Sequence, residues 1–197
     1  MANSTFSGPV RSEGGFKQIS KNSSTGVITD QVTVDSSGNL AQTAGVTNLI
    51  KDVENVTAAT KTLTAADTGT TFLMNRAGGI VITLPTAAAG LHYKFIIGTT
   101  FTGTFSIDAA AAVDIFTAGS TIVISDKDAP STVSLKQFHA DGSDDDKMTM
   151  DADTKGRFVG GVIDCLGIAT GGQGSATAVW QMNGFTFGDG TLATPFA

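Results

Sequence analysis

Short β-rich segments recur about every ten residues through the middle of the chain, separated by stretches of Gly, Asp and Pro. No apolar stripe of roughly 12 residues at helical spacing occurs in this region, which disfavours an α/β fold. Short strands at such intervals are typical of a β-sandwich or barrel. We therefore predict an all-β fold whose body is an antiparallel, jelly-roll-like sandwich. The segments are TFLM (71–74), IVITL (80–84), HYKFII (92–97), TFSI (104–107), VDIF (113–116), TIVIS (121–125) and TVSLKQF (132–138).

Three of these segments carry further detail. HYKFII alternates, so that Tyr93, Phe95 and Ile97 are expected to face the core, with His92 and Lys94 facing water. The two runs that flank NRAGG (75–79) are expected to form a hairpin around this Gly-containing loop. Residues 62–156 are therefore predicted to form the core of the sandwich.

The start of the chain has a different character. Its apolar residues are isolated among Gly, Ser, Pro, Asn and charged residues. Isolated hydrophobic side chains cannot form a core, but each can enter a pocket on a larger partner. We predict that residues 1–30 form an extended arm that binds a partner, and that residues 31–61 form a strand, begun by VITDQVTV (27–34), plus a linker. The expected contact residues are Phe6, Pro9, Val10, Arg11, Phe16 and Ile19.

The end of the chain is almost uncharged. From residue 161 onward it contains no Lys or Arg and only two Asp residues, yet it holds the only Trp. Such a segment is expected to lie against protein. We predict that residues 157–197 form Gly-rich strands that assemble a homotrimer, and the alternative is that they supply the last strands of the chain's own sandwich. The candidate interface residues are Trp180, Phe185, Phe187 and Phe196.

Charge and composition exclude several classes of protein. The chain of 197 residues has a formal net charge of −6, which disfavours nucleic acid as a partner. It has no run of roughly 18 apolar residues and no signal peptide, so no membrane partner is expected. Cys165 is the only cysteine, which fits synthesis and folding in a reducing cytoplasm.

Signals of catalysis are sparse. His92 and His139 lie far from any second ligand or nucleophile in the sequence, and Cys165 is expected to be a small buried residue. The acidic stretch at 141–156 lacks the spacing of an EF-hand, so a solvated loop is expected, with a calcium site as the alternative. A glycosidase-type carboxylate pair stays open, because such partners meet only in space. We predict no catalytic residue, metal or cofactor.

Residues 63–107, LTAADTGTTFLMNRAGGIVITLPTAAAGLHYKFIIGTTFTGTFSI, resemble a β-domain that recurs in structural proteins of tailed bacteriophages. The matching features are the AADTGTTFLM entry, the AGG turn, the ITLP strand end and the AGLHYKFIIG return. The opening, ANSTFSGPVRSEGGFKQISKNSSTG, is similar to the N-termini of small virion proteins from phages of marine bacteria. Together the two stretches cover about half of the chain. The usual final strand, D-G-x-x-W-Y-V, is replaced here by GRFVGGVIDCLGIATGG and a late Trp180.

The resemblance implies a virion structural protein with no catalytic residues to transfer. It first suggests a capsid decoration (cement) protein, located on the outer capsid surface, whose partner is the major capsid protein. The alternative is a head-fibre or tail-fibre component, although the chain shows neither long repeats nor a coiled-coil heptad. A capsule-degrading enzyme is less favoured, because the chain shows no catalytic signature and holds only one Trp and one Tyr that could stack on a sugar. A free carbohydrate-binding module is the least favoured, because it would not need the N-terminal arm.

Overall fold

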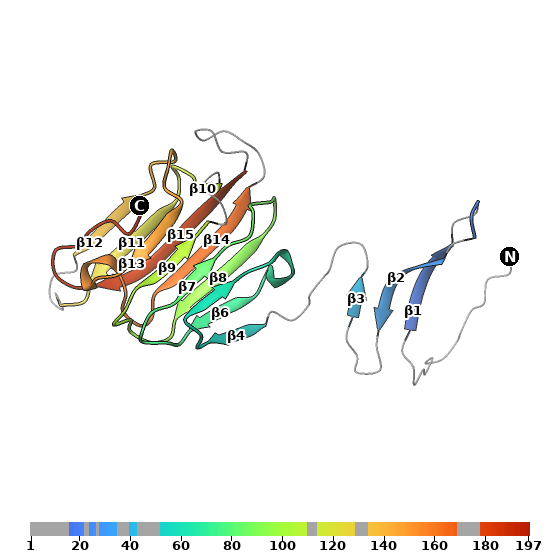
Figure 1. Cartoon of the computed structure of the whole chain (residues 1–197), viewed down its shortest axis with the longest axis horizontal. Coiled ribbons are helices and arrows are strands. Elements are labelled where there is room, and N and C mark those ends of the chain that lie inside the picture. Colours follow the sequence, from blue (N-terminus) through green and yellow to red (C-terminus); the bar gives the residue numbers. More distant parts are fainter. Residues whose placement is uncertain are drawn as a thin grey trace. The chain divides into compact units, whose positions relative to one another are not determined.

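The computed structural model divides the chain into two compact units, Met1–Ile50 and Lys51–Ala197 (Figure 1). Apart from two short 3-10 helices, Ala65–Asp67 and Asp153–Lys155, every regular element in the described residues is a strand. The predicted all-β class is therefore confirmed. The structure describes residues 16–21, 24–26, 28–34, 40–42, 52–109, 114–128, 134–168 and 178–197.

The first unit contains a three-stranded antiparallel sheet of order β1-β2-β3. Strand β2 (Ile28–Val34) is the one that the sequence predicted, and β1 (Phe16–Lys21) and β3 (Leu40–Gln42) pair with its two edges. Strand β1 was not expected as a paired strand, and it contains Phe16 and Ile19 of the predicted arm. The other arm residues, Phe6, Pro9, Val10 and Arg11, lie outside the described residues.

The second unit begins with three β-arches stacked on one another. Its large sheet contains β4 (Val53–Val56), β6 (Thr71–Met74) and β8 (His92–Ile97), which run parallel. The small sheet contains β5 (Thr60–Thr62), β7 (Val81–Thr83) and β9 (Phe105–Asp108), which also run parallel. The chain therefore crosses from one sheet to the other after each of β4, β6 and β8. Strands β4 and β5 fall within the segment expected to be strand plus linker, but they belong to the body.

The predicted hairpin around NRAGG is wrong, because β6 and β7 belong to different sheets. The turn between them packs on the next arch instead: the amides of Thr102 and Gly103 both donate to the carbonyl of Ala77, at 2.7 and 3.2 Å. A Gly-containing turn of this length permits either a hairpin or an arch. The choice is made by strand pairing with distant segments, which local alternation does not reveal.

The rest of the body extends both sheets. The large sheet has the order β12-β11-β15-β14-β8-β6-β4, with β10 also paired to β15, and the small sheet has the order β13-β9-β7-β5. Strands β10 and β11 run parallel to β15, whereas β12, β13 and β14 pair antiparallel with their neighbours. The strand directions are thus mixed, and the expectation of an antiparallel, jelly-roll-like order is not met in the arches. The added strands are β10 (Asp114–Phe116), β11 (Thr121–Asp126), β12 (Leu135–His139), β13 (Lys147–Met150), β14 (Val162–Ile168) and β15 (Ala178–Gly188).

The two sheets enclose one hydrophobic core. Along β8, Tyr93, Phe95 and Ile97 are buried, as the alternation of HYKFII predicted. Trp180 of β15 is fully buried, and its ring lies 5.8 Å from that of Tyr93. Phe196 lies 6.2 Å from Phe116 and is also buried. The C-terminal segment therefore supplies central strands of the chain's own large sheet.

Both open edges of the small sheet are protected against further strand pairing. At the β4–β5 end, Lys61 Nζ lies 2.8 Å and 3.0 Å from the two carboxylate oxygens of Glu54, and 5.7 Å from the centre of the Phe72 ring. A half-buried charged pair at an edge hinders the addition of another strand. At the other end the C-terminal residue pairs with β13, because Lys147 and Ala197 exchange both backbone hydrogen bonds.

Candidate functional site

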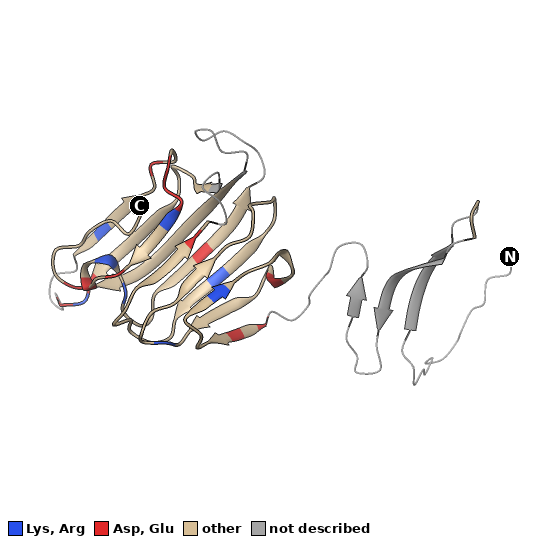
Figure 2. Cartoon of the chain, in the orientation of Figure 1, with Lys and Arg blue, Asp and Glu red and all other residues tan. Residues whose placement is uncertain are grey.

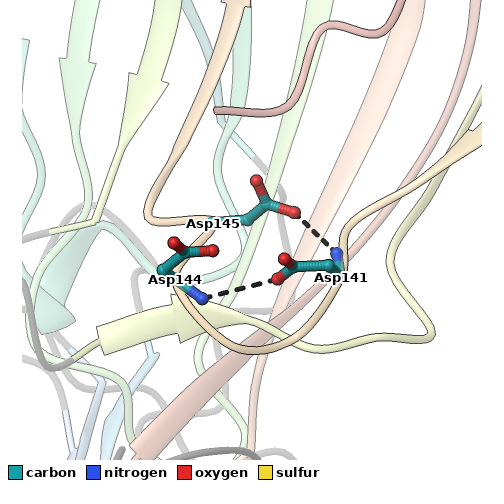
Figure 3. Close-up of side chains that lie close together, drawn as sticks. All are labelled: Asp141, Asp144 and Asp145. Atoms are coloured by element: carbon teal, nitrogen blue, oxygen red, sulfur yellow. Dashed lines mark hydrogen bonds between the residues drawn. The ribbon is translucent and has the colours of Figure 1, made fainter.

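Three carboxylates of the acidic loop lie close together. One oxygen of each of Asp141, Asp144 and Asp145 lies within 4.8 Å of the others, which brings part of the predicted acidic cluster together (Figure 3). The loop itself uses these groups as hydrogen-bond acceptors. The amide of Ser143 donates to Asp141 at 2.7 Å, and the amide of Asp141 donates to Asp145 at 2.6 Å. The geometry is thus that of a turn closed by its own carboxylates.

Hydrogen bonds and burial shift the pKa values of Asp141 and Asp145 in opposite directions. Donation by the Ser143 amide lowers the pKa of Asp141, because it stabilises the carboxylate. Partial burial raises the pKa of Asp145, and the nearby charge of Asp141 adds to the effect. The two shifts have opposite signs, so their contributions to the stability in mild acid oppose one another.

The histidines and the cysteine do not form a catalytic group. His92 Nε2 lies 3.3 Å from Asp164 Oδ1 on the outer face of the large sheet, and His139 Nδ1 lies 3.0 Å from Thr121 Oγ1 on β11. Cys165 is fully buried on the opposite, inner face, and this burial raises the pKa of its thiol. His92 and Cys165 therefore occupy the positions that their sequence environment predicted.

The titration of Tyr93, which can be followed by absorbance, tests whether this side chain is buried in the core. Its hydroxyl donates to the carbonyl of Thr64 at 2.8 Å, and burial, with the charge of Asp67, raises its pKa to about 12. Tyr93 is the only tyrosine of the chain, so its titration can be followed without interference. The raised pKa means that the folded state keeps its proton while the unfolded chain loses it, so stability falls as pH rises from 10 towards 12.

We therefore expect the absorbance of tyrosinate to appear near pH 12 in the folded protein and near pH 10 in denaturant. Circular dichroism measured in parallel should show loss of structure before or together with ionisation. Ionisation near pH 10 with the fold intact would contradict the buried, hydrogen-bonded position of Tyr93.

An apolar row crosses the outer face of the large sheet. Register places five apolar side chains side by side on five adjacent strands, and all five are at least partly exposed. Phe185 is 44% exposed, and the ring of Phe187 packs edge-on against its ring, with 5.3 Å between the ring centres. Cross-strand pairs of this kind stabilise a sheet, but they also leave an apolar surface in water. The row consists of Val123 (β11), Phe185 (β15), Val162 (β14), Ile96 (β8) and Leu73 (β6).

A polar row lies beside the apolar row, two residues along each strand. Its centre is the pair formed by Lys94 on β8 and Asp164 on β14, which are opposite in register with Nζ and Oδ2 3.8 Å apart. Both side chains remain about 40% exposed. Charges are otherwise few here, since β15 has none and β14 has only Asp164 (Figure 2). The row consists of Thr121, Asn183, Asp164, Lys94 and Thr71.

The predicted interface residues divide into two pairs. Trp180 and Phe196 are buried in the chain's own core, so in this fold their side chains cannot contact another copy. Phe185 and Phe187 point to the outer face, where the first is exposed and the second partly exposed. Sequence reasoning did not identify the apolar row, because its members are joined only by the register of five strands. The alternation of HYKFII was the one local signal, since it left Ile96 on the outer face.

No family model matches the chain, and no curated protein or solved structure is found to be similar to it. In the described part of the chain, no helix has the length and apolar character needed to cross a membrane.

Proposed function

We propose that this chain is a structural protein of a tailed-phage particle that decorates the outer surface of the head by binding the major capsid protein. The observation that carries the proposal is the resemblance of residues 63–107 to phage structural β-domains. These residues form the second and third stacked arches, β6–β7 and β8–β9, of a body joined to a separate N-terminal unit. A compact β-body attached to a second small unit suits a surface protein that has one part for the shell and one for solvent.

The N-terminal segment is the proposed contact with the shell. Ordering a chain segment costs on the order of 1–2 kcal/mol per residue, so the arm needs several anchors on a repetitive, rigid partner. A capsid lattice provides such a partner. Phe6 and Val10 serve as the first anchors because they are isolated apolar residues beside Pro9 and Arg11. Each anchor contributes about 1.5–3 kcal/mol when its side chain becomes buried.

The double variant Phe6→Ser/Val10→Ser is expected to bind heads stripped of the protein at least roughly 30-fold more weakly than the natural chain, because two buried side chains are lost. Co-sedimentation with stripped heads, across a range of protein concentrations, gives the affinity. The matched control is Ser7→Ala/Ser12→Ala, two substitutions in the same segment that remove no apolar group. Equal binding by the anchor variant and the control would show that Phe6 and Val10 do not anchor the chain to the capsid, and would contradict the proposed role of the arm.

A head-fibre or tail-fibre component is the second candidate. The observation that favours it is the parallel stacking of three arches, since β-solenoids elongate by adding coils of this kind. The number of copies separates the two candidates. Quantitative mass spectrometry of purified virions would find a decoration protein in numbers comparable to the major capsid protein, whereas a fibre would be present in a few copies per particle.

A further inference from the structure

We propose that the outer face of the large sheet binds the same face of a second copy of this chain, about a twofold axis. The surface concerned is the apolar row together with the polar row beside it. Of the four aromatic residues that the sequence offered for a threefold assembly, two are in the core. The two that remain lie on a sheet face, and its charges are arranged for a twofold pairing.

Both edges of the small sheet are protected against the addition of a further strand. The Glu54–Lys61 pair lies at one edge, and the pairing of Ala197 with Lys147 covers the other. The outer face has no comparable protection, since it carries a 44% exposed Phe185 within a row of apolar neighbours. A second copy can therefore remove the apolar row from water by packing face to face.

The positions of the charged side chains on this face favour the same face of a second copy as the binding partner. Lys94 and Asp164 are neighbours on β8 and β14. Consider a twofold axis parallel to the strands and midway between β8 and β14, in the plane between the two faces. Rotation about this axis lays β14 of one copy over β8 of the other and keeps every row over the same row. Lys94 of each copy then lies over Asp164 of the second copy, so both contacts are between opposite charges.

The same rotation matches the apolar residues. Val162 of one copy lies over Ile96 of the other, and Phe185 lies over Leu73. Four of the five members of the apolar row therefore pack against the apolar row of the second copy, while Val123 lies over the edge strand β4. Face-to-face packing of two sheets whose mean strand directions lie within about 30° of each other is a standard arrangement for twisted sheets. A twofold interface uses the same patch on both copies, as this self-complementary surface requires.

The first test measures the mass of the full chain by sedimentation equilibrium over a wide range of concentrations. The natural chain is expected to form a dimer, with twice the 20.0 kDa mass of the monomer. Phe185→Ser should weaken the dimer at least about tenfold while leaving the circular dichroism spectrum unchanged, because Phe185 is exposed in the single chain. Leu135→Ser is the matched control, since Leu135 is an exposed apolar residue on the edge strand β12, outside both rows.

The second test uses charge reversal and depends on contacts between copies. In the dimer of the Lys94→Asp variant, both contacts between positions 94 and 164 are between two acidic side chains. In the dimer of the Asp164→Lys variant, both contacts are between two lysines. Each variant alone is therefore expected to be mainly monomeric. An equimolar mixture of the two variants should dimerise again. In the mixed pair, the two acidic side chains of one copy face the two lysines of the other. The control reversal, Lys155→Asp, disrupts the partly exposed Lys155–Asp151 pair, which lies outside both rows, and should leave the mass unchanged.

Native mass spectrometry, with one variant isotopically labelled, identifies the mixed dimer directly. Recovery of the mixed dimer from two monomeric variants would establish the reciprocal pairing, because a change confined to each chain cannot be corrected by the other chain. A natural chain that stays monomeric at all concentrations would overturn the proposal. So would a trimer, or a dimer that is insensitive to both Phe185→Ser and the charge reversals.

Discussion

Trp180→Ala is expected to destabilise the chain by about 3–5 kcal/mol, the usual cost of removing a large, fully buried aromatic side chain. Trp180 lies on β15, which pairs with β10, β11 and β14 at the centre of the large sheet, and its ring packs at 5.8 Å from Tyr93. The cavity left by alanine would therefore open in the middle of the core. For a chain of this size, the melting temperature should fall by roughly 10 °C.

Urea denaturation followed by circular dichroism measures this loss, and sedimentation of the same samples shows whether the assembled mass changes. Trp180→Phe is the matched control. It keeps an aromatic ring and removes an indole N–H that has no hydrogen-bond partner in the core, so its cost should be clearly smaller. A lowered mass with an unchanged free energy of unfolding would instead place Trp180 at a subunit interface.

Gly79→Ala is the second substitution with a large expected effect. Gly79 has a φ of 92°, and a Cβ at this position would lie 2.1 Å from the carbonyl oxygen of Thr104 in the next arch. The clash is with backbone, so one arch must move away from the other. Left-handed backbone alone costs roughly 1–2 kcal/mol for a residue with a side chain, and the clash adds to it. We expect a total above about 3 kcal/mol, or failure to fold.

Gly90→Ala separates the conformational cost of left-handed backbone from the cost of the steric clash. Gly90 has a φ of 85°, but no atom lies within 4 Å of the position that its Cβ would occupy. This variant should show only the conformational cost, on the order of 1 kcal/mol. Comparison of the two variants by urea denaturation tests the stacking of the arches. Similar small losses at both positions would mean that the turn at 77–79 does not pack on the following arch.

The sequence predicted where the strands of the body lie better than how they pair. Alternation in HYKFII located β8 and its buried face, because a half-buried strand leaves a period of two in the sequence. It could not show that β6 and β7 enter different sheets, since both flank a turn that fits a hairpin. Strand β13 was missed because its residues, Lys147–Met150, follow a run of Asp residues that indicated a loop.

The candidate surface was even less accessible to sequence reasoning. Leu73 and Val123 lie in the same row only because three strands between them share a register. The near absence of charge after residue 160 correctly indicated contact with protein. It could not show that Trp180 contacts the chain's own core while Phe185, five residues later on the same strand, faces outward. An odd separation along a strand reverses the face, which is apparent only when both residues are known to share one strand.

Electron cryomicroscopy of purified virions tests the proposed function most directly. The account predicts that the protein is found at regularly repeated positions over the outer surface of the head, with its N-terminal segment against the major capsid protein and its β-body outside. Particles lacking the protein should have the same shell without this outer layer. Density confined to the tail or to one vertex, or absence of the protein from the particle, would contradict its role as a decoration protein.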